Sequence, residues 1–315
     1  MPTYRTIGIN LKSKPTGEAD RLMTILTKEQ GLIRVIAPSA RKQKSSLSGR
    51  SALFVVNDLL IAKGKSMDKI TQAETIESYP GLALDLKKLT AGQYLVELTL
   101  QQALSEQAQT ELFYLLTEHL GRLNKAVGST ILPSLAHGVF QLLALAGIAP
   151  QMHQCCLSGE LLQPELGNPH WRVGFSPELG GAVTLEALDR LRAERLAFAH
   201  PHSNRPTRIA SDAAQVREEL VLEEFNGIRR VAEQPLQIYG RKRSRTQQLG
   251  ATQVFIMQQL AGATLPILDP DWLPPGLSTE MAWLSIERLL RQCAYYQFDR
   301  AIRSASLIDS LFVSP

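Results

Sequence analysis

The stretch of this sequence with the clearest capacity for chemistry is a set of cations without neighbouring acids. No Asp or Glu occurs in residues 31–57. The cations of this stretch are Arg34, Arg41, Lys42, Lys44 and Arg50. Lys and Arg head groups, serine hydroxyls and backbone N–H groups are the groups that contact phosphate in nucleic-acid complexes. We therefore predict that this stretch binds a nucleic-acid backbone, although a solvated surface loop is the plainer interpretation of the same pattern.

Other cations are weaker candidates. The second-rank contacts are Lys12, Lys14 and Arg21, and Arg21 has Glu18 and Asp20 as alternative partners. Lysines that could extend the patch are Lys63, Lys65 and Lys69. A separate basic run begins with Arg241, Lys242 and Arg243 in a predicted loop at 234–250. A second nucleic-acid site and a tolerated charged insertion explain this run equally well.

The distribution of charge supports a polyanionic partner for the first quarter of the chain. The 315 residues carry 34 Lys and Arg against 30 Asp and Glu, a net charge of +4. Residues 1–80 hold 13 of these cations and 7 of the acids, so the basic excess lies in this part alone. Its only aromatic residues are Tyr4, Phe54 and Tyr79. We therefore predict binding through phosphates, insensitive to base sequence and steeply dependent on salt.

Several classes of protein are disfavoured by what the sequence lacks. Three cysteines are too few for a disulfide scaffold, and neither a secretory signal nor a membrane-spanning stretch is recognisable. A phosphate-binding loop G-x-x-x-x-G-K-[ST], a G-x-G-x-x-G turn and an H-E-x-x-H zinc motif are also missing. We therefore expect a soluble protein of a reducing cytoplasm that has no membrane partner, needs no cofactor and is not an enzyme.

The basic residues must be positioned by the elements around them, and residues 1–80 are patterned as strands. Alternating or β-branched runs predict strands at 4–11, 21–27, 32–37, 52–62 and 69–76. Closing five short strands into a barrel hides their edges, and the spacing fits an OB-fold, although an SH3-like barrel is not distinguished. Residues 38–51 would then be a flexible basic loop between the third and fourth strands.

Beyond residue 80 the hydrophobic period becomes that of amphipathic helices. We predict helices at 82–100, 112–123, 132–146, 185–198, 216–225, 249–260 and 281–298. Residues 151–184 lose this period and gain Gly and Pro, which indicates a small irregular lobe. The predicted organisation is α+β and multidomain. It has a barrel at 1–80 and a helical domain at 81–150 and 185–315, with the lobe at 151–184 between the two helical parts.

Two segments resemble a known family. Residues 17–50, with the motifs Gly17-Glu18-Ala19-Asp20-Arg21 and Ala40-Arg41-Lys42-Gln43-Lys44-Ser45, and residues 69–81 are similar to the N-terminal domain of the bacterial RecO family. The resemblance implies an OB-fold followed by a helical domain with a zinc-ribbon-like lobe. It also implies a DNA repair protein, not an enzyme, that binds single- and double-stranded DNA and anneals complementary strands. With RecR, such a protein helps to load RecA onto DNA coated by single-strand DNA-binding protein.

The chain departs from the family pattern in the lobe. The family usually has two C-x-x-C pairs there. Cys155 matches the first ligand position, whereas Ser158, Thr184 and Ala187 stand at the other three. We therefore predict a zinc-ribbon-like lobe that has lost its ligands, binds no metal and is stabilised by packing. The residues expected to pack it are Trp171, Phe175 and Leu179.

Some assignments stay open at this level. Arg300 and Arg303 resemble the family's terminal basic helix, where they could contact DNA or a partner or interact with a helix end. The bare sequence also fits two other functions that would use the same basic patch. One is a protein adaptor that binds acidic protein tails, and the other is an RNA-binding barrel protein, which competition between matched RNA and DNA strands would identify.

Overall fold

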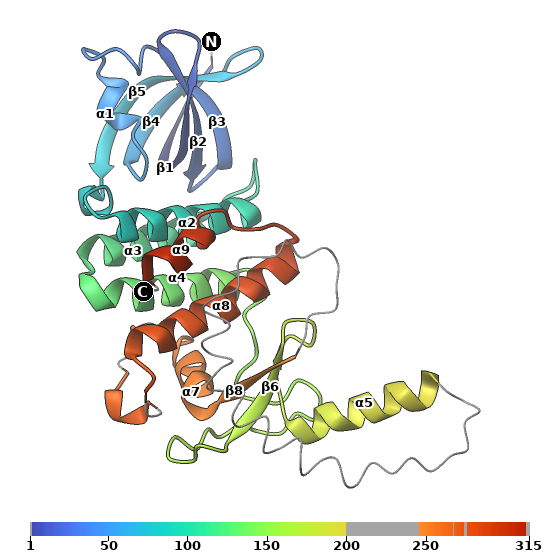
Figure 1. Ribbon diagram of the computed structural model, residues 1–315. Coiled ribbons are helices and arrows are strands. Elements are labelled where there is room, and N and C mark those ends of the chain that lie inside the picture. The colour runs from blue at the N-terminus through green and yellow to red at the C-terminus, as the bar shows by residue number, and fades with distance from the viewer. Residues whose placement is uncertain (1, 200–245, 267, 274–275, 313–315) are drawn as a thin grey trace. The chain divides into compact units, whose positions relative to one another are not determined.

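The computed structural model describes residues 2–199, 246–266, 268–273 and 276–312 and divides the chain into two compact units (Figure 1). The first unit contains Met1–Ala149 and Ile256–Ile308, and the second contains Pro150–Phe255 and Asp309–Pro315. The barrel and a group of helices belong to the first unit. The lobe belongs to the second.

Five strands near the N-terminus form a closed barrel in the order β1-β2-β3-β5-β4, which confirms the predicted OB-like fold. The strands are β1 (Thr3–Thr16), β2 (Asp20–Thr27), β3 (Gly31–Ala37), β4 (Val56–Ala62) and β5 (Asp68–Glu77). β1 pairs with both β2 and β4, and a bulge after Asn10 interrupts its register with β2. Alternating apolar side chains such as Met23, Ile25 and Val35 fill the interior.

The barrel has a short seam between β3 and β5. These strands are parallel and pair only at Val35–Asp68 and Ile36–Lys69. The connection from β3 to β4 contains the short helix α1 (Leu47–Arg50), which contacts β5. Ala40 and Leu47 of this connection are buried in the barrel core. The predicted loop at 38–51 therefore includes a short helix and two buried apolar residues that the sequence did not indicate.

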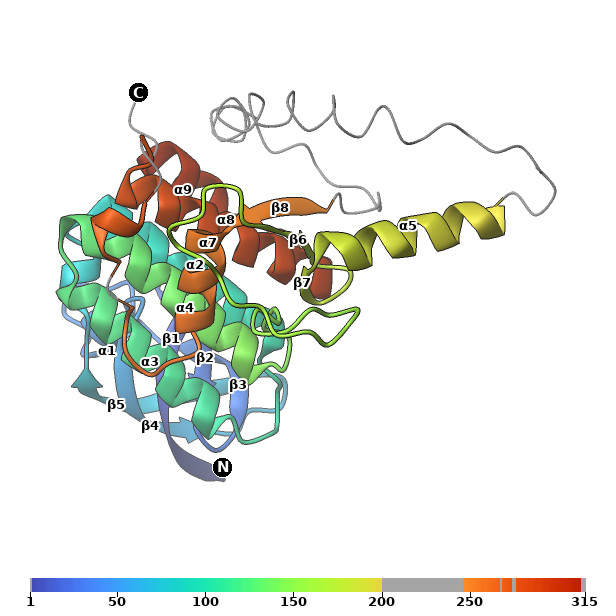
Figure 2. The same cartoon turned by 90° about the horizontal axis from the view of Figure 1, so that it is seen from below.

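The main helices of the first unit are α2 (Leu86–Gln102), α3 (Thr110–Lys125), α4 (Ile131–Leu145) and α8 (Thr279–Phe298), with short 3-10 turns η1 (Pro80–Leu82), η2 (Gly128–Thr130) and η3 (Pro270–Trp272). α4 packs against α2, α3 and α8 and lies among them in Figure 2. Within the described ranges, Gly128–Leu145 is the one helical segment long and apolar enough to cross a membrane, but 67% of it is buried inside the molecule. α4 is thus the apolar core of this helical group.

The turn between β2 and β3 joins the barrel to the helices through main-chain bonds. The N–H of Leu32 donates to Leu104 O at 2.8 Å, and the N–H of Glu106 donates to Gln30 O at 3.1 Å. Gly31 has a φ of +64°, and a Cβ there would lie 2.3 Å from Leu104 O, so only glycine fits. We call this contact the Gly31 latch. It holds the barrel against the connection between α2 and α3.

The second unit contains a three-stranded sheet in the order β7-β6-β8 and the helix α5 (Leu185–Ala199). Its strands are β6 (Arg172–Ser176), β7 (Gly181–Val183) and β8 (Gln247–Gly250). The sequence predicted a loop to residue 250 and a helix from residue 249, whereas Leu249 pairs with Val173 in the sheet. The helix α7 (Ala251–Gln259) begins only after this strand, and α9 (Ala305–Phe312) was not predicted. The helix predicted at 216–225 lies outside the described residues.

Candidate nucleic-acid interface

Strand pairing brings several predicted cations onto one outer face of the barrel. Thr24 of β2 is paired with Lys12 of β1 on one side and with Arg34 of β3 on the other. Directly paired residues point to the same face of a sheet, and neighbouring strands lie about 4.8 Å apart. The backbones at Lys12 and Arg34 are therefore about 10 Å apart across the face. Both side chains are exposed.

A second row of paired residues on this face includes Lys69, which the sequence indicated only as a possible extension of the basic patch. Leu22 of β2 is paired with Lys14 and with Ile36, and Ile36 is paired with Lys69 of β5. Lys14 and Lys69 are exposed, whereas Leu22 and Ile36 are half-buried. We call Lys12, Lys14, Arg34 and Lys69 the outer-face cations. Lys69 could not be placed from the sequence, because its position depends on the parallel pairing of β5 with β3.

The beginning of the basic segment is fixed beside the turn between β1 and β2. Asp20 Oδ1 accepts the N–H of Ser39 at 2.7 Å, and the N–H of Arg41 donates to Ala19 O at 2.9 Å. The Arg41 guanidinium donates to Gly17 O at 3.1 Å. Arg41, Lys42 and Lys44 are all exposed. These three residues, the segment cations, are thus displayed from an ordered backbone at the end of the barrel where β1 meets β2.

Arg50 is held by two buried amides. Its carbonyl oxygen accepts Asn10 Nδ2 at 2.7 Å and Asn57 Nδ2 at 2.9 Å, and each Asn is 1% exposed. The Arg50 guanidinium donates to Ser46 O at 3.2 Å, so it turns back along α1, and the residue is half-buried. The sequence did not identify the two asparagines. The sequence carried no clear signal for them, because their strands hold other polar residues such as Thr6 and Asp58.

The segment and outer-face cations are not neutralised by carboxylates. None of them forms an ion pair within the part of the chain that the structure describes. Asp20, which lies next to them, is used by the N–H of Ser39. Arg5 of β1 behaves differently, because it pairs with Asp58 at 2.7 Å and holds the pKa of that carboxyl below its usual range. An unpaired cation is free to contact phosphate.

Arg21 is separated from this set. It is paired with Pro15 and Ala37, in the register that faces the barrel interior, and is half-buried. Its guanidinium donates to Ser13 Oγ at 3.1 Å, and its buried Nε has no partner among the described residues. The alternative pairing with Glu18 or Asp20 is not formed.

The aromatic residues of the barrel offer no stacking platform. Phe54 and Tyr79 are each 5% exposed, and Tyr4 is half-buried with its hydroxyl donating to Asp68 at 3.0 Å. Burial and this contact with Asp68 raise the pKa of Tyr4 above its ordinary value. Lys63 and Lys65 are exposed in the turn between β4 and β5, close in sequence to Lys69. The arrangement suits phosphates better than bases.

Two other predicted basic sites have different outcomes. Arg241, Lys242 and Arg243 lie outside the described residues. Arg300 and Arg303 are exposed in the connection between α8 and α9, so they are not in a terminal helix. The backbone N–H of Arg303 donates to Glu97 Oε2 at 2.6 Å, which ties this connection to α2.

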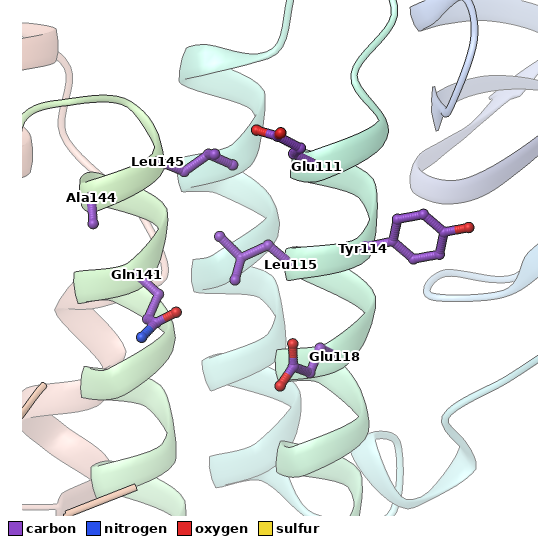
Figure 3. A pocket seen from close by; sticks show the side chains of 7 residues that line it. All are labelled: Glu111, Tyr114, Leu115, Glu118, Gln141, Ala144 and Leu145. Carbon is purple, nitrogen blue, oxygen red and sulfur yellow. The ribbon is translucent and has the colours of Figure 1, made fainter. Parts of the chain in front are cut away.

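A groove between α3 and α4 has the opposite electrostatic character. It encloses about 460 Å³ and is lined by Glu111, Tyr114, Leu115, Glu118, Gln141, Ala144 and Leu145 (Figure 3). Two of these lining residues are carboxylates and none is a cation. Glu118 is paired with Arg122 at 2.5 Å. The lining therefore offers no cation to a phosphate, and the groove is not part of the candidate interface.

The lobe does not have the donors that zinc requires. Structural zinc takes four Cys or His ligands, but no group of three or more His, Cys, Asp or Glu suited to a metal occurs in the described residues. Cys155 is buried, and His153 and His170 are exposed. Burial acts to raise the pKa of the Cys155 thiol, but hydrogen bonds from Ser158, Thr184 and Leu157 outweigh it and lower the pKa to about 7. Of the predicted packing residues, Phe175 is fully buried and Trp171 and Leu179 are half-buried.

Comparison with known proteins gives a consistent result along the chain. Residues 1–79 match the family described as Recombination protein O N terminal, and residues 83–197 match Recombination protein O C terminal. The chain is 47% identical over 320 residues to DNA repair protein RecO of Nostoc punctiforme, covering 99% of this chain and 97% of that protein. It is 39% identical over 309 residues to DNA repair protein RecO of Synechococcus elongatus, covering 98% and 96%.

Proposed function

Because this chain belongs to the RecO family of DNA repair proteins, we propose that it is a recombination mediator that binds DNA through the backbone and anneals complementary strands. The proposed ligands are single- and double-stranded DNA. The proposed protein partners are RecR and single-strand DNA-binding protein, and the role shared with RecR is to help load RecA. This role requires no chemical step by the protein itself.

The observation that supports DNA binding most directly is the lack of ion pairs. The segment cations Arg41, Lys42 and Lys44 and the outer-face cations have no carboxylate partner among the described residues, although Arg5 on the same barrel has one. Each cation that reaches a phosphate releases a condensed counterion, which favours binding whatever the base sequence.

Annealing follows from the same electrostatics. Two complementary single strands repel each other through their phosphates, and a cationic surface lowers that repulsion while leaving base edges free to pair. The half-buried Leu22 and Ile36 lie between Lys14 and Lys69. None of the paired positions in these two rows is an aromatic residue that would compete with base pairing by stacking. Backbone binding of this kind is compatible with strand pairing.

The decisive experiment measures the annealing of complementary oligonucleotides by the full-length protein. Fluorescence reports the annealing rate, and the measurement is repeated across a series of salt concentrations. We expect annealing to be accelerated at low salt and the affinity for poly-dT to fall with a log–log slope of about −0.7 for each phosphate neutralised. An affinity that does not change with salt would contradict the proposal. A matched RNA strand as competitor tests for 2′-hydroxyl contacts, and preference for RNA would favour an RNA-binding protein instead.

The mediator step needs its own measurement. RecA assembly on DNA coated by single-strand DNA-binding protein is followed with and without this protein and RecR. We expect assembly to be faster only when both are present. DNA binding with no effect on RecA assembly would leave backbone binding supported and contradict the mediator role.

A further inference from the structure

The lobe of the second unit is organised around one sulfur atom. Cys155 Sγ accepts the N–H of Ser158 at 3.4 Å and the N–H of Thr184 at 3.3 Å. It also lies 3.7 Å from Thr184 Oγ1. Cys155 is 2% exposed, so solvent cannot substitute for these donors. The sulfur therefore connects the turn at 155–158 with the start of α5.

Thr184 carries this network to a fourth position. Its Oγ1 accepts the N–H of Ala187 at 3.4 Å, as the N-cap residue of a helix does. Cys155, Ser158, Thr184 and Ala187 thus form one hydrogen-bonded group, which we call the Cys155 cluster. The cluster consists of two pairs, 155 with 158 and 184 with 187. Two residues separate the partners in each pair, and the two pairs come from separate segments of the chain.

Main-chain bonds around the cluster hold the same two segments. The N–H of Cys156 donates to Ala182 O at 2.9 Å, and the N–H of Ala182 donates to Gln151 O at 2.8 Å. Gly181 allows this approach, since a Cβ there would lie 2.2 Å from Gln151 O. The two segments are therefore in register through bonds that involve no metal.

We propose that hydrogen bonds to Cys155 Sγ replace a metal ion as the cross-link of this lobe, while residues 158, 184 and 187 keep the converging positions of zinc ligands. The spacing is that of two C-x-x-C pairs, but a Ser hydroxyl, a Thr hydroxyl and a methyl group are not the thiolate or imidazole donors that zinc takes in such sites. The lobe then folds independently of zinc supply. This inference does not depend on DNA binding or annealing.

The first test restores the missing donors. The variant Ser158→Cys/Thr184→Cys/Ala187→Cys has four thiols at the cluster, and we expect it to bind one zinc ion per chain. Replacement by Co²⁺ should give the absorption bands of tetrahedral thiolate coordination. We expect unmodified protein, purified in parallel and incubated with zinc, to retain none. Stoichiometric zinc in the unmodified protein would overturn the proposal, and so would a folded variant that binds no metal.

A second measurement keeps the proposal testable if the triple variant does not fold. The substitution Cys155→Ala removes the acceptor of two N–H groups, so amide exchange at Ser158 and Thr184 should become about tenfold faster. Cys156→Ser is the matched control, because Cys156 Sγ accepts no N–H from these two residues. Unchanged exchange in Cys155→Ala would show that the sulfur does not cross-link the lobe.

Discussion

Several cations of the barrel and several cations of the helical group differ in whether they are paired with acids. On the barrel, the segment cations and outer-face cations are exposed and lack ion-pair partners in the described chain. On the helices, Arg122 is paired with Glu118 at 2.5 Å, and Lys87 lies 3.8 Å from Glu280. Arg291 pairs with the fully buried Glu287 at 2.5 Å. The two sets of charges differ in pairing, and an unpaired cation suits a polyanion better than a paired one does.

Paired and unpaired cations have different effects on stability and on binding. A surface ion pair contributes little to stability, so leaving the barrel cations unpaired costs the fold little. Their mutual repulsion is relieved when phosphate binds, which increases affinity. In the helical group, a paired charge attracts neither phosphate nor counterions strongly. We therefore expect substitution of the barrel cations to change DNA binding, and substitution of the buried Arg291–Glu287 pair to change stability.

The largest effect should come from reversing the segment cations. Arg41→Glu/Lys42→Glu/Lys44→Glu replaces three attractive charges with three repulsive ones, and we expect the affinity for single-stranded DNA to fall by about 100-fold or more at low salt. Binding is measured by fluorescence anisotropy with a poly-dT oligonucleotide. The fold should persist, because these side chains are exposed.

If this variant kept its affinity for single-stranded DNA, the unpaired segment cations of the barrel would not be what binds DNA. The DNA site would then lie elsewhere, and the basic run at residues 241–245 would be the next candidate. Circular dichroism before and after the substitution excludes unfolding as the cause of any decrease in affinity.

The helical group should respond to pH through His119. Burial, together with the charges of His137 and Arg122, lowers the pKa of His119 to about 3. The unfolded chain takes up this proton near pH 6.5, so stability is complete above that value and is lost as the pH falls toward 3. We expect the equilibrium constant for folding to fall by up to about tenfold for each pH unit in this range.

The measurement is denaturant unfolding between pH 7 and pH 4. His119→Phe keeps a ring beside His137 and cannot be protonated, so its unfolding free energy should depend less on pH. His153→Gln, at an exposed position, is the control and should leave the pH dependence unchanged. If the unfolding free energy of all three proteins depended equally on pH, the fold would not keep His119 uncharged.

A smaller effect is expected on the outer face. Lys12→Ala/Arg34→Ala removes two cations that flank Thr24, and the affinity for single-stranded DNA should fall by about tenfold at low salt. The log–log salt slope should become shallower by about 0.7 for each phosphate that is no longer neutralised. An unchanged slope would mean that DNA does not cross this face and that only the segment cations bind it.

Removing one of the two amide hydrogen bonds to Arg50 O should have a moderate effect on both stability and DNA binding. Asn57→Leu removes the amide that donates to Arg50 O at 2.9 Å, which should cost about 1–3 kcal/mol of unfolding free energy. DNA affinity should fall a few-fold, because the end of the basic segment is less well positioned. Thr75→Val, which removes only the hydroxyl bonded to Asn57 Oδ1, is the milder control.

The smallest effect should come from Arg5. This cation lies on β1, like Lys12 and Lys14, but it is already paired with Asp58. Arg5→Gln should change the affinity for DNA by less than about twofold, since a guanidinium held by a carboxylate neutralises no phosphate. A large decrease in affinity would show that pairing does not decide which barrel cations bind DNA.

The barrel was predictable because its strands alternate in polarity, whereas features set by distant pairing were not. The role of Lys69 depends on two paired positions between β3 and β5, and Leu249 was expected in a helix but joins β6 across the sheet. The apolar Ala40 and Leu47 stand within a polar segment, so their burial in the barrel core was not predicted. The set of cations was accessible from composition, but its division into paired and unpaired members required the fold.

The Gly31 latch has a mechanical consequence. Leu32 and Gln30 bond through their backbones to Leu104 and Glu106, so a rotation of the barrel relative to this connection would break two hydrogen bonds. If the barrel binds DNA as proposed, a force on the bound strand would reach the connection between α2 and α3 through these two backbone bonds.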